Sequence, residues 1–412
     1  MKRIVALLLV GLMVFSLLGC SKKAAETTTD TKKEDTNAAE TTKEADNASG
    51  KTSGDPIKIG LTTVLTGDRA LEGEYASNAA KIVQDEINEA GGVLGRPIEV
   101  VIEDALGTDV GAVNAFRKLA ADKEITAIIG SDSSNDNMAI SSSVLEAKIL
   151  TTAQGSSPKL RDICDNDNPY LFQLRASDQT LCAALIKYAV EKQGLKSFAI
   201  IHDTETASQD QARLFTEALA TYGLKPVITV PFTTGTKDFS SHLAQVQAAK
   251  PDAIIGAMFH TEGAILLQQI RSLGIELPFF GSNVFGDPIT LQLAGEAMND
   301  VYSAAPWVPN TPNPIGAAFA KKYKELHGVE CAKSAAQIYD HVKVICEAIK
   351  LAGSTDRQAV RDAMQTINHY EGAITVYDMR TNGDCGRGGL IVQIKDLVPT
   401  IIEELYSEKV IK

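Results

Sequence analysis

Two short polar segments carry the residue types that bind an anion. One reads SDSSNDN over residues 131–137 and follows the apolar run Ile125–Ile129, and the other reads TTAQGSSP over residues 151–158. Free backbone N–H groups at the start of a helix, together with serine hydroxyls, make a site for a carboxylate or a phosphate. The alternative is that Ser, Asn and Asp only cap helices and form turns here. On these segments alone, both interpretations stay open.

The sequence contains no motif that is typical of an enzyme. It has no Gly-x-Ser-x-Gly elbow, no Walker A phosphate loop and no His-Glu-x-x-His. His202-Asp203, at the end of an apolar run, is a pair that offers acid–base chemistry. The histidines show no metal-ligand spacing; they are His202, His242, His260, His327, His341 and His369. We therefore expect no catalysis, no metal and no cofactor.

The composition is that of an ordinary globular protein. The 412 residues are 44% hydrophobic and 22% charged, and the formal net charge is −12. An acidic chain without a basic stripe is not expected to bind nucleic acid. Six cysteines in this length do not form a disulfide scaffold, and the five that follow Cys20 leave at least one thiol unpaired.

Apolar runs alternate with amphipathic helices from Ile57 onward, and the alternation restarts after Arg175. The apolar run 57–64, for example, precedes a helical face that includes Ala76, Ala80 and Val83. Strands separated by helices of this length imply βαβ units and a parallel sheet. The tetrapeptide Ala-Ile-Ile-Gly, at 127–130 and again at 253–256, supports a duplication. The prediction is an α/β fold of two doubly wound, Rossmann-like lobes.

The chain is expected to pass between these lobes several times. Lobe 1 is predicted to comprise residues 55–176 and 307–378, and lobe 2 residues 177–306 and 379–412. Several crossings make a hinge beside a cleft. Because ligands bind at the carboxyl ends of parallel strands, the loops that follow those strands should form the walls of the cleft.

The first 54 residues differ from the rest of the chain. Lys2 and Arg3 precede an apolar stretch of about 15 residues, which is too short to span a membrane and is typical of a signal peptide. The stretch ends Leu17-Leu18-Gly19-Cys20, which resembles the lipobox of bacterial lipoproteins; the alternative is an ordinary secretory signal with a chance cysteine. Residues 21–54 contain no Val, Ile, Leu, Met, Phe, Trp or Tyr, so they cannot bury enough apolar surface to become ordered. We predict a signal peptide over 1–19, then a lipidated Cys20 and a disordered tether over 20–54.

Six short motifs follow one another along residues 55–405. They are Ile57-Lys58-Ile59-Gly60 with Thr66-Gly67, Ile87-Asn88-x-x-Gly91-Gly92, Ile128-Ile129-Gly130 before the serine-rich segment, Ile200-Ile201-His202-Asp203, Thr236-Lys237-Asp238-Phe239, and Arg271-Ser272-Leu273-Gly274 before Gly281. In this order and spacing they resemble the solute-binding proteins of branched-chain amino-acid ABC importers, the leucine/isoleucine/valine-binding family with the periplasmic-binding-protein type I fold. The resemblance implies two lobes that close on a ligand and deliver it to a membrane permease.

The same resemblance implies which residues bind the ligand. In that family a hydroxyl residue and a small–hydroxyl pair bind the α-carboxylate of the ligand, and the matching positions here are Ser134 and Gly155-Ser156. The acidic residue that meets the ligand's ammonium group falls at Asn283, with Asp287 one helical turn away. Phe259 is also among the expected ligand-binding residues.

Several family positions carry other residue types here. Two aromatic positions are Glu72 and Ala207, and a cysteine pair found in some members is replaced by Gly107 and Ser133. Glu72 and Ala207 make a larger, more polar pocket that suits leucine or valine poorly. A buried carboxylate needs a cationic or hydrogen-bonding partner, which Arg69 or the ligand would supply. The alternative is that Glu72 points to solvent.

We therefore expect an extracytoplasmic receptor that captures an amino acid or a related small polar solute and delivers it to the permease subunits of an ABC importer. It should be a monomer, held at a membrane by its lipid anchor, on a cell surface of the Gram-positive type. The alternative is a sensory ectodomain that binds amino acids or amides without transport. A lipid anchor without a transmembrane or output domain favours transport.

Overall fold

The computed structural model describes residues 52–405, and residues 49–412 form one compact unit. The signal peptide predicted over 1–19, the lipidated Cys20 and nearly all of the tether lie outside the described residues. In the part that is described, no helix combines the length and the apolar character needed to cross a membrane.

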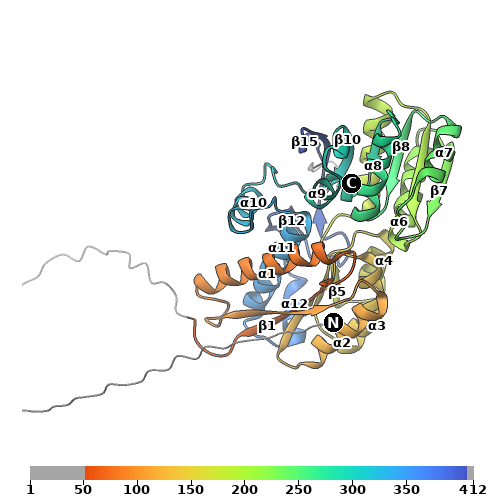
Figure 1. Ribbon diagram of the computed structural model, residues 1–412. Helices are drawn as coiled ribbons and strands as arrows, with labels where there is room; N and C mark the ends of the chain where they lie inside the picture. The colour runs from red at the N-terminus through yellow and green to blue at the C-terminus, as the bar shows by residue number, and fades with distance from the viewer. Residues whose placement is uncertain (1–51, 406–412) are drawn as a thin grey trace, which may run out of the picture. The chain divides into compact units, whose positions relative to one another are not determined.

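The first sheet is built entirely of parallel strands in the order β2-β1-β3-β4-β5. These are β1 (Ile57–Thr63), β2 (Ile98–Asp104), β3 (Ile125–Ile129), β4 (Thr151–Ala153) and β5 (Leu171–Gln173). The connecting helices are α1 (Ala70–Glu89), α2 (Asp109–Ala121), α3 (Ser134–Ala147) and α4 (Pro158–Asn166). Successive β3 residues face opposite sides, so Ile129 packs in the core with α1 while Ile128 packs with α2 and α3. Helices therefore cover both faces of this sheet (Figure 1).

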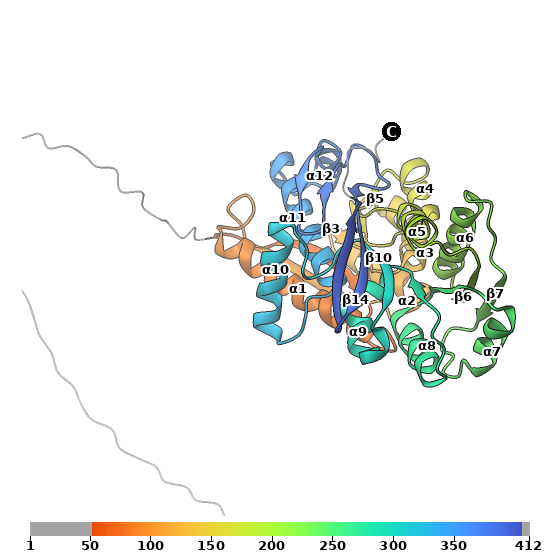
Figure 2. The same ribbon diagram turned by 90° about the horizontal axis from the view of Figure 1, so that it is seen from above.

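The second sheet repeats this plan and adds two antiparallel strands at one edge. Its order is β15-β14-β10-β9-β8-β6-β7, and β14 lies antiparallel to β10 (Figure 2). The strands are β6 (Phe198–Asp203), β7 (Ile228–Phe232), β8 (Ala253–Ala257), β9 (Phe279–Gly281), β10 (Val301–Ala305), β14 (Leu390–Lys395) and β15 (Val398–Glu404). The helices are α5 (Asp178–Lys187), which continues into a π-helical turn at Tyr188–Lys192, α6 (Thr206–Ala220), α7 (Ser240–Ala249), α8 (His260–Ser272) and α9 (Pro288–Ala294).

The two sheets share one topology, which confirms the predicted pair of doubly wound lobes. In each, the second strand along the chain lies at the edge, the first lies next to it, and the third pairs with the first on its other side. The repeated Ala-Ile-Ile-Gly segments fall on β3 and β8, the third strand of each sheet. We call the residues packed on the first sheet lobe 1 and those packed on the second sheet lobe 2.

The chain passes between the lobes three times. Leu174 lies in the core of lobe 1 and Leu181 on α5 in the core of lobe 2, so the first passage lies between them. The second passage is shorter still, from Ala305 at the end of β10 to Trp307 in the core of lobe 1. Beyond it, the chain in lobe 1 forms α10 (Pro314–His327), α11 (Lys333–Ala352), α12 (Arg357–Met364) and the short strands β11 (Tyr370–Glu371), β12 (Val376–Tyr377) and β13 (Gly386–Arg387).

The third passage comes later than the predicted boundary after residue 378. Met379 and Cys385 are buried in the core of lobe 1, and the backbone N–H of Cys385 donates to the Gln173 carbonyl at 3.0 Å. The chain reaches the second sheet only at Leu390. The sequence has no apolar run between Tyr377 and Gly389, so no periodic pattern predicted that this segment packs on lobe 1.

Candidate ligand-binding site

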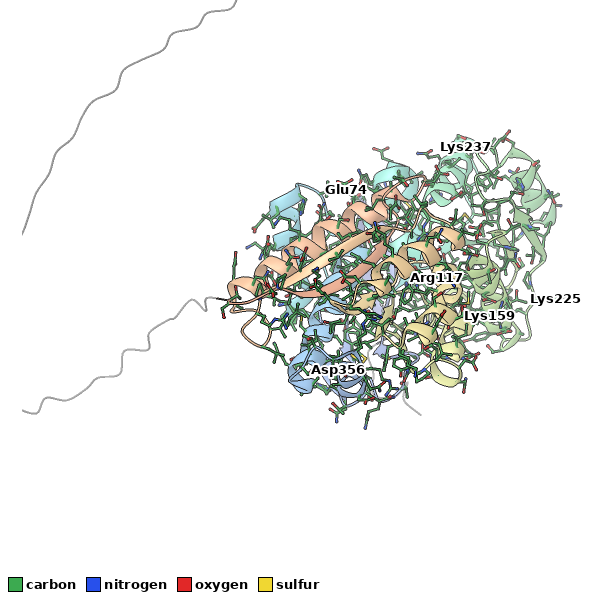
Figure 3. The ribbon with its side chains drawn as sticks, turned by 90° about the horizontal axis from the view of Figure 1, so that it is seen from below. Glu74, Arg117, Lys159, Lys225, Lys237 and Asp356 are labelled. Atoms are coloured by element: carbon green, nitrogen blue, oxygen red, sulfur yellow. The ribbon has the colours of Figure 1, made fainter. Side chains whose placement is uncertain are left out.

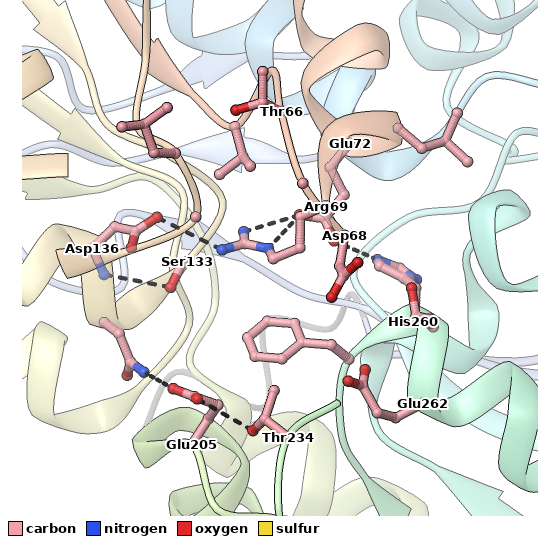
Figure 4. A pocket seen from close by; sticks show the side chains of 18 of the residues that line it. Thr66, Asp68, Arg69, Glu72, Ser133, Asp136, Glu205, Thr234, His260 and Glu262 are labelled. Atoms are coloured by element: carbon pink, nitrogen blue, oxygen red, sulfur yellow. Dashed lines mark hydrogen bonds and ion pairs between the residues drawn. The ribbon is translucent and has the colours of Figure 1, made fainter. Parts of the chain in front are cut away.

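A cavity with about 1120 Å³ of space, open to solvent, lies between the two lobes. Lobe 1 contributes the loops after β1 and β2 and the start of α3, and lobe 2 contributes the segments after β6, β7 and β8 and part of α9. Apart from α9, every wall follows the carboxyl end of a parallel strand, which is where doubly wound sheets bind ligands. Figure 4 shows these walls facing one another.

An ion pair between Arg69 and Glu72 forms one wall of the cavity. Arg69 directly precedes α1, and its Nη2 and Nε lie 2.9 Å and 3.1 Å from Glu72 Oε2. Its Nη1 lies 3.7 Å from Asp136 Oδ2, and its guanidinium lies 5.1 Å from the ring centre of Phe259 in lobe 2. Burial alone would lower the pKa of Arg69, but Glu72 and Asp136 hold that pKa above its ordinary value. Glu72 is only 6% exposed, so it does not point to bulk solvent.

His260 faces Glu72 from the other lobe. The hydroxyl of Thr290 donates to the Val284 carbonyl at 2.6 Å, so its oxygen accepts from His260 Nδ1 at 2.7 Å. His260 Nε2 is then directed to Glu72 Oε1, 3.6 Å away. This contact is an ion pair when His260 is protonated, and it joins α1 of lobe 1 to the start of α8 in lobe 2.

Two further carboxylates line the wall of lobe 2. Glu205 accepts hydrogen bonds from Asn135 Nδ2 across the cavity at 2.9 Å and from Thr234 Oγ1 at 3.2 Å. Glu262, on α8, is 6% exposed and accepts from the Gly235 backbone N–H at 2.9 Å. Figure 4 shows Asp68 and Glu262 reaching toward the open centre from different walls.

The residues predicted to bind the ligand carboxylate lie close together, but beside the cavity and not on its lining. Ser134, the first residue of α3, accepts hydrogen bonds through Oγ from the backbone N–H groups of Ser156 and Ser157, both at 3.1 Å. A Cβ on Gly155 would lie 2.6 Å from that same oxygen, so glycine allows the two loops to meet. Ser134 and Ser156 are each 5% exposed. The structure thus brings Ser134, Gly155 and Ser156 together, with the backbone amides of Ser156 and Ser157 bound to the Ser134 hydroxyl.

The remaining predicted residues divide between the cavity and the interior. Arg69, Glu72 and Phe259 line the cavity, as do Gly107 and Ser133. Asn283 is buried and donates to Asp178 Oδ1 at 3.1 Å, and Asp287 caps α9 by accepting from Ile289 N at 3.0 Å. Ala207 is half-buried on α6 and does not line the cavity.

The sequence interpretation missed most of the polar residues of the lining, among them Asp136, Glu205, His260 and Glu262. These four all come within seven residues of the end of a parallel strand. Their position after β3, β6 and β8 was the available signal, since the cleft was expected at exactly those strand ends.

A buried ion cluster connects the site to the first passage between the lobes. Asp132 Oδ2 lies 3.2 Å from Lys333 Nζ at the start of α11, and Asp132 Oδ1 lies 3.8 Å from Arg175 Nη1. Burial alone would raise the pKa of Asp132, but Lys333 and Arg175 lower it to about 2. Within residues 52–405 no group of His, Cys, Asp and Glu side chains is placed to hold a metal ion. The five described cysteines are all buried free thiols: Cys164, Cys182, Cys331, Cys346 and Cys385.

Comparison with known proteins agrees with this architecture. Residues 56–396 match the family model described as periplasmic binding protein. The Leu/Ile/Val-binding protein BraC3 of Rhizobium johnstonii is 26% identical over 75% of this chain and 83% of its own length. A leucine-binding protein of Thermotoga maritima has the same fold, with a TM-score of 0.78, 24% identity, and coverage of 86% of this chain and 99% of its own. The Streptococcus pneumoniae branched-chain amino-acid binding protein solved with isoleucine also has a TM-score of 0.78, at 22% identity, and covers 85% of this chain and 99% of its own. The chain therefore belongs to the periplasmic binding protein family, in the type I group of the branched-chain amino-acid ABC importers.

Proposed function

We propose that this protein is an extracytoplasmic receptor that binds an amino acid or a related small polar solute and delivers it to an ABC importer. The observation that carries the proposal is the cavity between the lobes, whose walls are loops from both parallel sheets. A ligand held there touches both lobes at once, so its binding energy favours the closed arrangement. A permease that distinguishes closed from open lobes then receives only loaded protein.

An amino acid is the proposed solute class because the relatives are named for leucine, isoleucine and valine. The branched aliphatic side chain itself fits poorly, because the charged residues Glu72 and Glu262 line the cavity. In this proposal the ligand carboxylate displaces the Ser134 hydroxyl from the amides of Ser156 and Ser157 as the cleft closes.

A thermal-shift screen of the purified protein against the standard amino acids tests the binding function. A ligand at 100 times its Kd stabilises the folded state by about 2.7 kcal/mol, which is readily seen as a higher Tm. If no amino acid, amide or amine raises the Tm, the proposed binding function is wrong. If a ligand binds but deletion of the gene for this protein leaves uptake of that ligand by the native host unchanged, a sensory role replaces delivery to an importer.

The proposed attachment to the membrane depends on Cys20. A diacylated cysteine anchors a protein stably, whereas a single chain binds only marginally. Mass spectrometry of the protein from its native host should show a mature chain that begins at a lipid-modified Cys20. An unmodified Cys20 would exclude the anchor without affecting ligand binding.

A further inference from the structure

The cavity between the lobes is lined by an excess of carboxylates. Six acidic side chains face one guanidinium, which leaves a formal charge of −5 when His260 is neutral. The acidic residues are Asp68, Glu72, Asp109, Asp136, Glu205 and Glu262. A cleft with one sign of charge concentrates ligands of the opposite sign.

The single guanidinium in the lining is already occupied. Arg69 is bound to Glu72 at 2.9 Å, lies 3.7 Å from Asp136, and rests against the ring of Phe259. It is the only Lys or Arg among the described residues that line the cavity. A ligand that brings surplus negative charge would therefore meet no free cation there.

Glu262 is a second, independent indication that the cavity binds a positively charged group. It is 6% exposed, yet among residues 52–405 it forms no ion pair, and its one hydrogen bond comes from the Gly235 backbone N–H. Glu205 is likewise bound only by the neutral donors Asn135 and Thr234. A buried carboxylate is costly unless a cation or several donors compensate it. Glu262 reaches toward the open centre of the cavity (Figure 4), where a ligand would lie.

We infer that the ligand is an organic cation whose ammonium or guanidinium groups outnumber its carboxylates, with a positive group bound by Glu262 and Glu205. This inference rests on the proposed binding function and specifies its substrate class. Basic amino acids and aliphatic diamines share the required chemistry. Charge-assisted hydrogen bonds from such a group would add to the single hydrogen bond that Glu262 accepts from the Gly235 N–H.

Isothermal titration calorimetry on the purified protein distinguishes the possible ligands. The probes are arginine, lysine, putrescine and spermidine, with leucine, isoleucine and glutamate as neutral and anionic comparisons. At least one cation should bind tenfold or more tightly than leucine, and its affinity should fall as salt is raised. Binding of arginine or lysine without putrescine shows that the α-carboxylate is also recognised, and the reverse shows a diamine site.

The near-isosteric variant Glu262→Gln tests the residue itself. It should weaken binding of the preferred cation by tenfold or more, because it removes the charge while it keeps an oxygen to accept the Gly235 N–H. Glu276→Gln, at an exposed position just beyond α8, is the matched control and should change affinity by less than twofold.

Three results would overturn the inference. Tighter binding of leucine or isoleucine than of any cation contradicts the charge argument while the proposed receptor function survives. An unchanged cation affinity in Glu262→Gln contradicts the assignment of this carboxylate. Failure of all four cations to bind contradicts the inference, and the receptor function falls with it only if the thermal-shift screen finds no ligand either.

Discussion

Ser134 joins two loops through one hydroxyl oxygen, and removal of that oxygen should lower the free energy of unfolding. Ser134→Ala leaves two buried N–H groups, those of Ser156 and Ser157, without an acceptor. Each such group costs about 1–3 kcal/mol, so for the two groups we expect a loss of roughly 2–6 kcal/mol in the free energy of unfolding. If this oxygen also gives way to the ligand carboxylate, the variant should bind ligand more weakly.

Urea unfolding of the variant and of Ser142→Ala, an exposed serine on the same helix, measures this effect. The control should lie within about 0.5 kcal/mol of the natural protein. Equal stability of Ser134→Ala and the control would show that the two amides find other partners.

His341 gives the protein a pH-dependent stability. It is fully buried against Thr152 Oγ1 at 2.8 Å, and burial lowers its pKa from 6.5 to about 3. Between these two pH values His341 is protonated in the unfolded chain and neutral in the folded chain. The contribution of neutral His341 to stability is therefore complete above pH 6.5 and declines as the pH falls toward 3.

The effect of His341 has to be measured by comparison with a variant, because burial raises the pKa values of Asp203, Asp340 and Asp384 to about 6. These three carboxyl groups stabilise the folded state as the pH falls, which opposes the effect of His341. We expect the free energy of unfolding to fall more steeply between pH 7 and pH 4.5 in the natural protein than in His341→Gln. Parallel pH profiles for the two proteins would contradict a neutral buried histidine.

At the scale of secondary structure, the long periodic elements were predictable, whereas several short ones were not. The apolar face of α1 and the apolar runs on β1, β3 and β8 match the observed elements closely. By contrast, β5 has three residues, and α4 and α9 are short helices that begin with proline. These elements are buried because residues distant in the sequence pack against them. Each is too short to show a periodic apolar pattern from which it could be predicted.

The same limit explains the site. The cavity was predictable in position, since it follows from strand ends in a doubly wound sheet. The residues that line it were not, because Glu205 and Glu262 lie far from Arg69 in the sequence. They line one cavity with it only when the start of α6 and the start of α8 lie opposite Arg69. The approach of Ser134 to Gly155 is likewise a contact between separate loops, and only the family resemblance grouped these residues.

The start of α11 depends on one buried charge. Lys333 is 3% exposed and neutralises Asp132, so Lys333→Met leaves that carboxylate with only Arg175 at 3.8 Å. Removal of one partner from a buried ion pair destabilises a protein by about 3–5 kcal/mol. The pKa of Asp132 should rise as well, so the folded variant binds a proton more readily and its deficit in stability should shrink as the pH falls.

Thermal unfolding at several pH values checks both effects. Lys350→Met, at the exposed far end of the same helix, is the control and should change stability by less than about 0.5 kcal/mol. If the two variants are equally stable, the buried pair contributes nothing and Arg175 alone suffices for Asp132.

At the scale of the whole molecule, two lobes of the same topology meet through a few polar contacts beside the cavity. Asn135 contacts Glu205, and Glu72 faces His260. Lys159 on α4 lies where lobe 1 meets lobe 2 (Figure 3), with its Nζ 3.0 Å from Asp210 Oδ1 on α6. Polar contacts of this kind form and break at little net cost in water, whereas the cores within each lobe do not. The lobes are therefore expected to separate as units, with movement confined to the three passages.

Asp210 allows this expectation to be tested away from the ligand. It is 3% exposed, and besides Lys159 it accepts a hydrogen bond from Ser157 Oγ at 3.2 Å, so two contacts between the lobes converge on one carboxylate. Asp210→Asn weakens both and should shift the ligand-free protein toward the open arrangement. The competent closed state then becomes rarer, which should weaken ligand affinity by roughly threefold to tenfold. Small-angle X-ray scattering should give a larger radius of gyration without ligand and the natural value at saturation. Glu325→Gln, on α10, removes only an exposed pair with Lys321 far from Asp210 and should leave both measurements unchanged. An Asp210→Asn protein with natural dimensions and affinity would show that closure is set by the passages between the lobes rather than by the contacts across them.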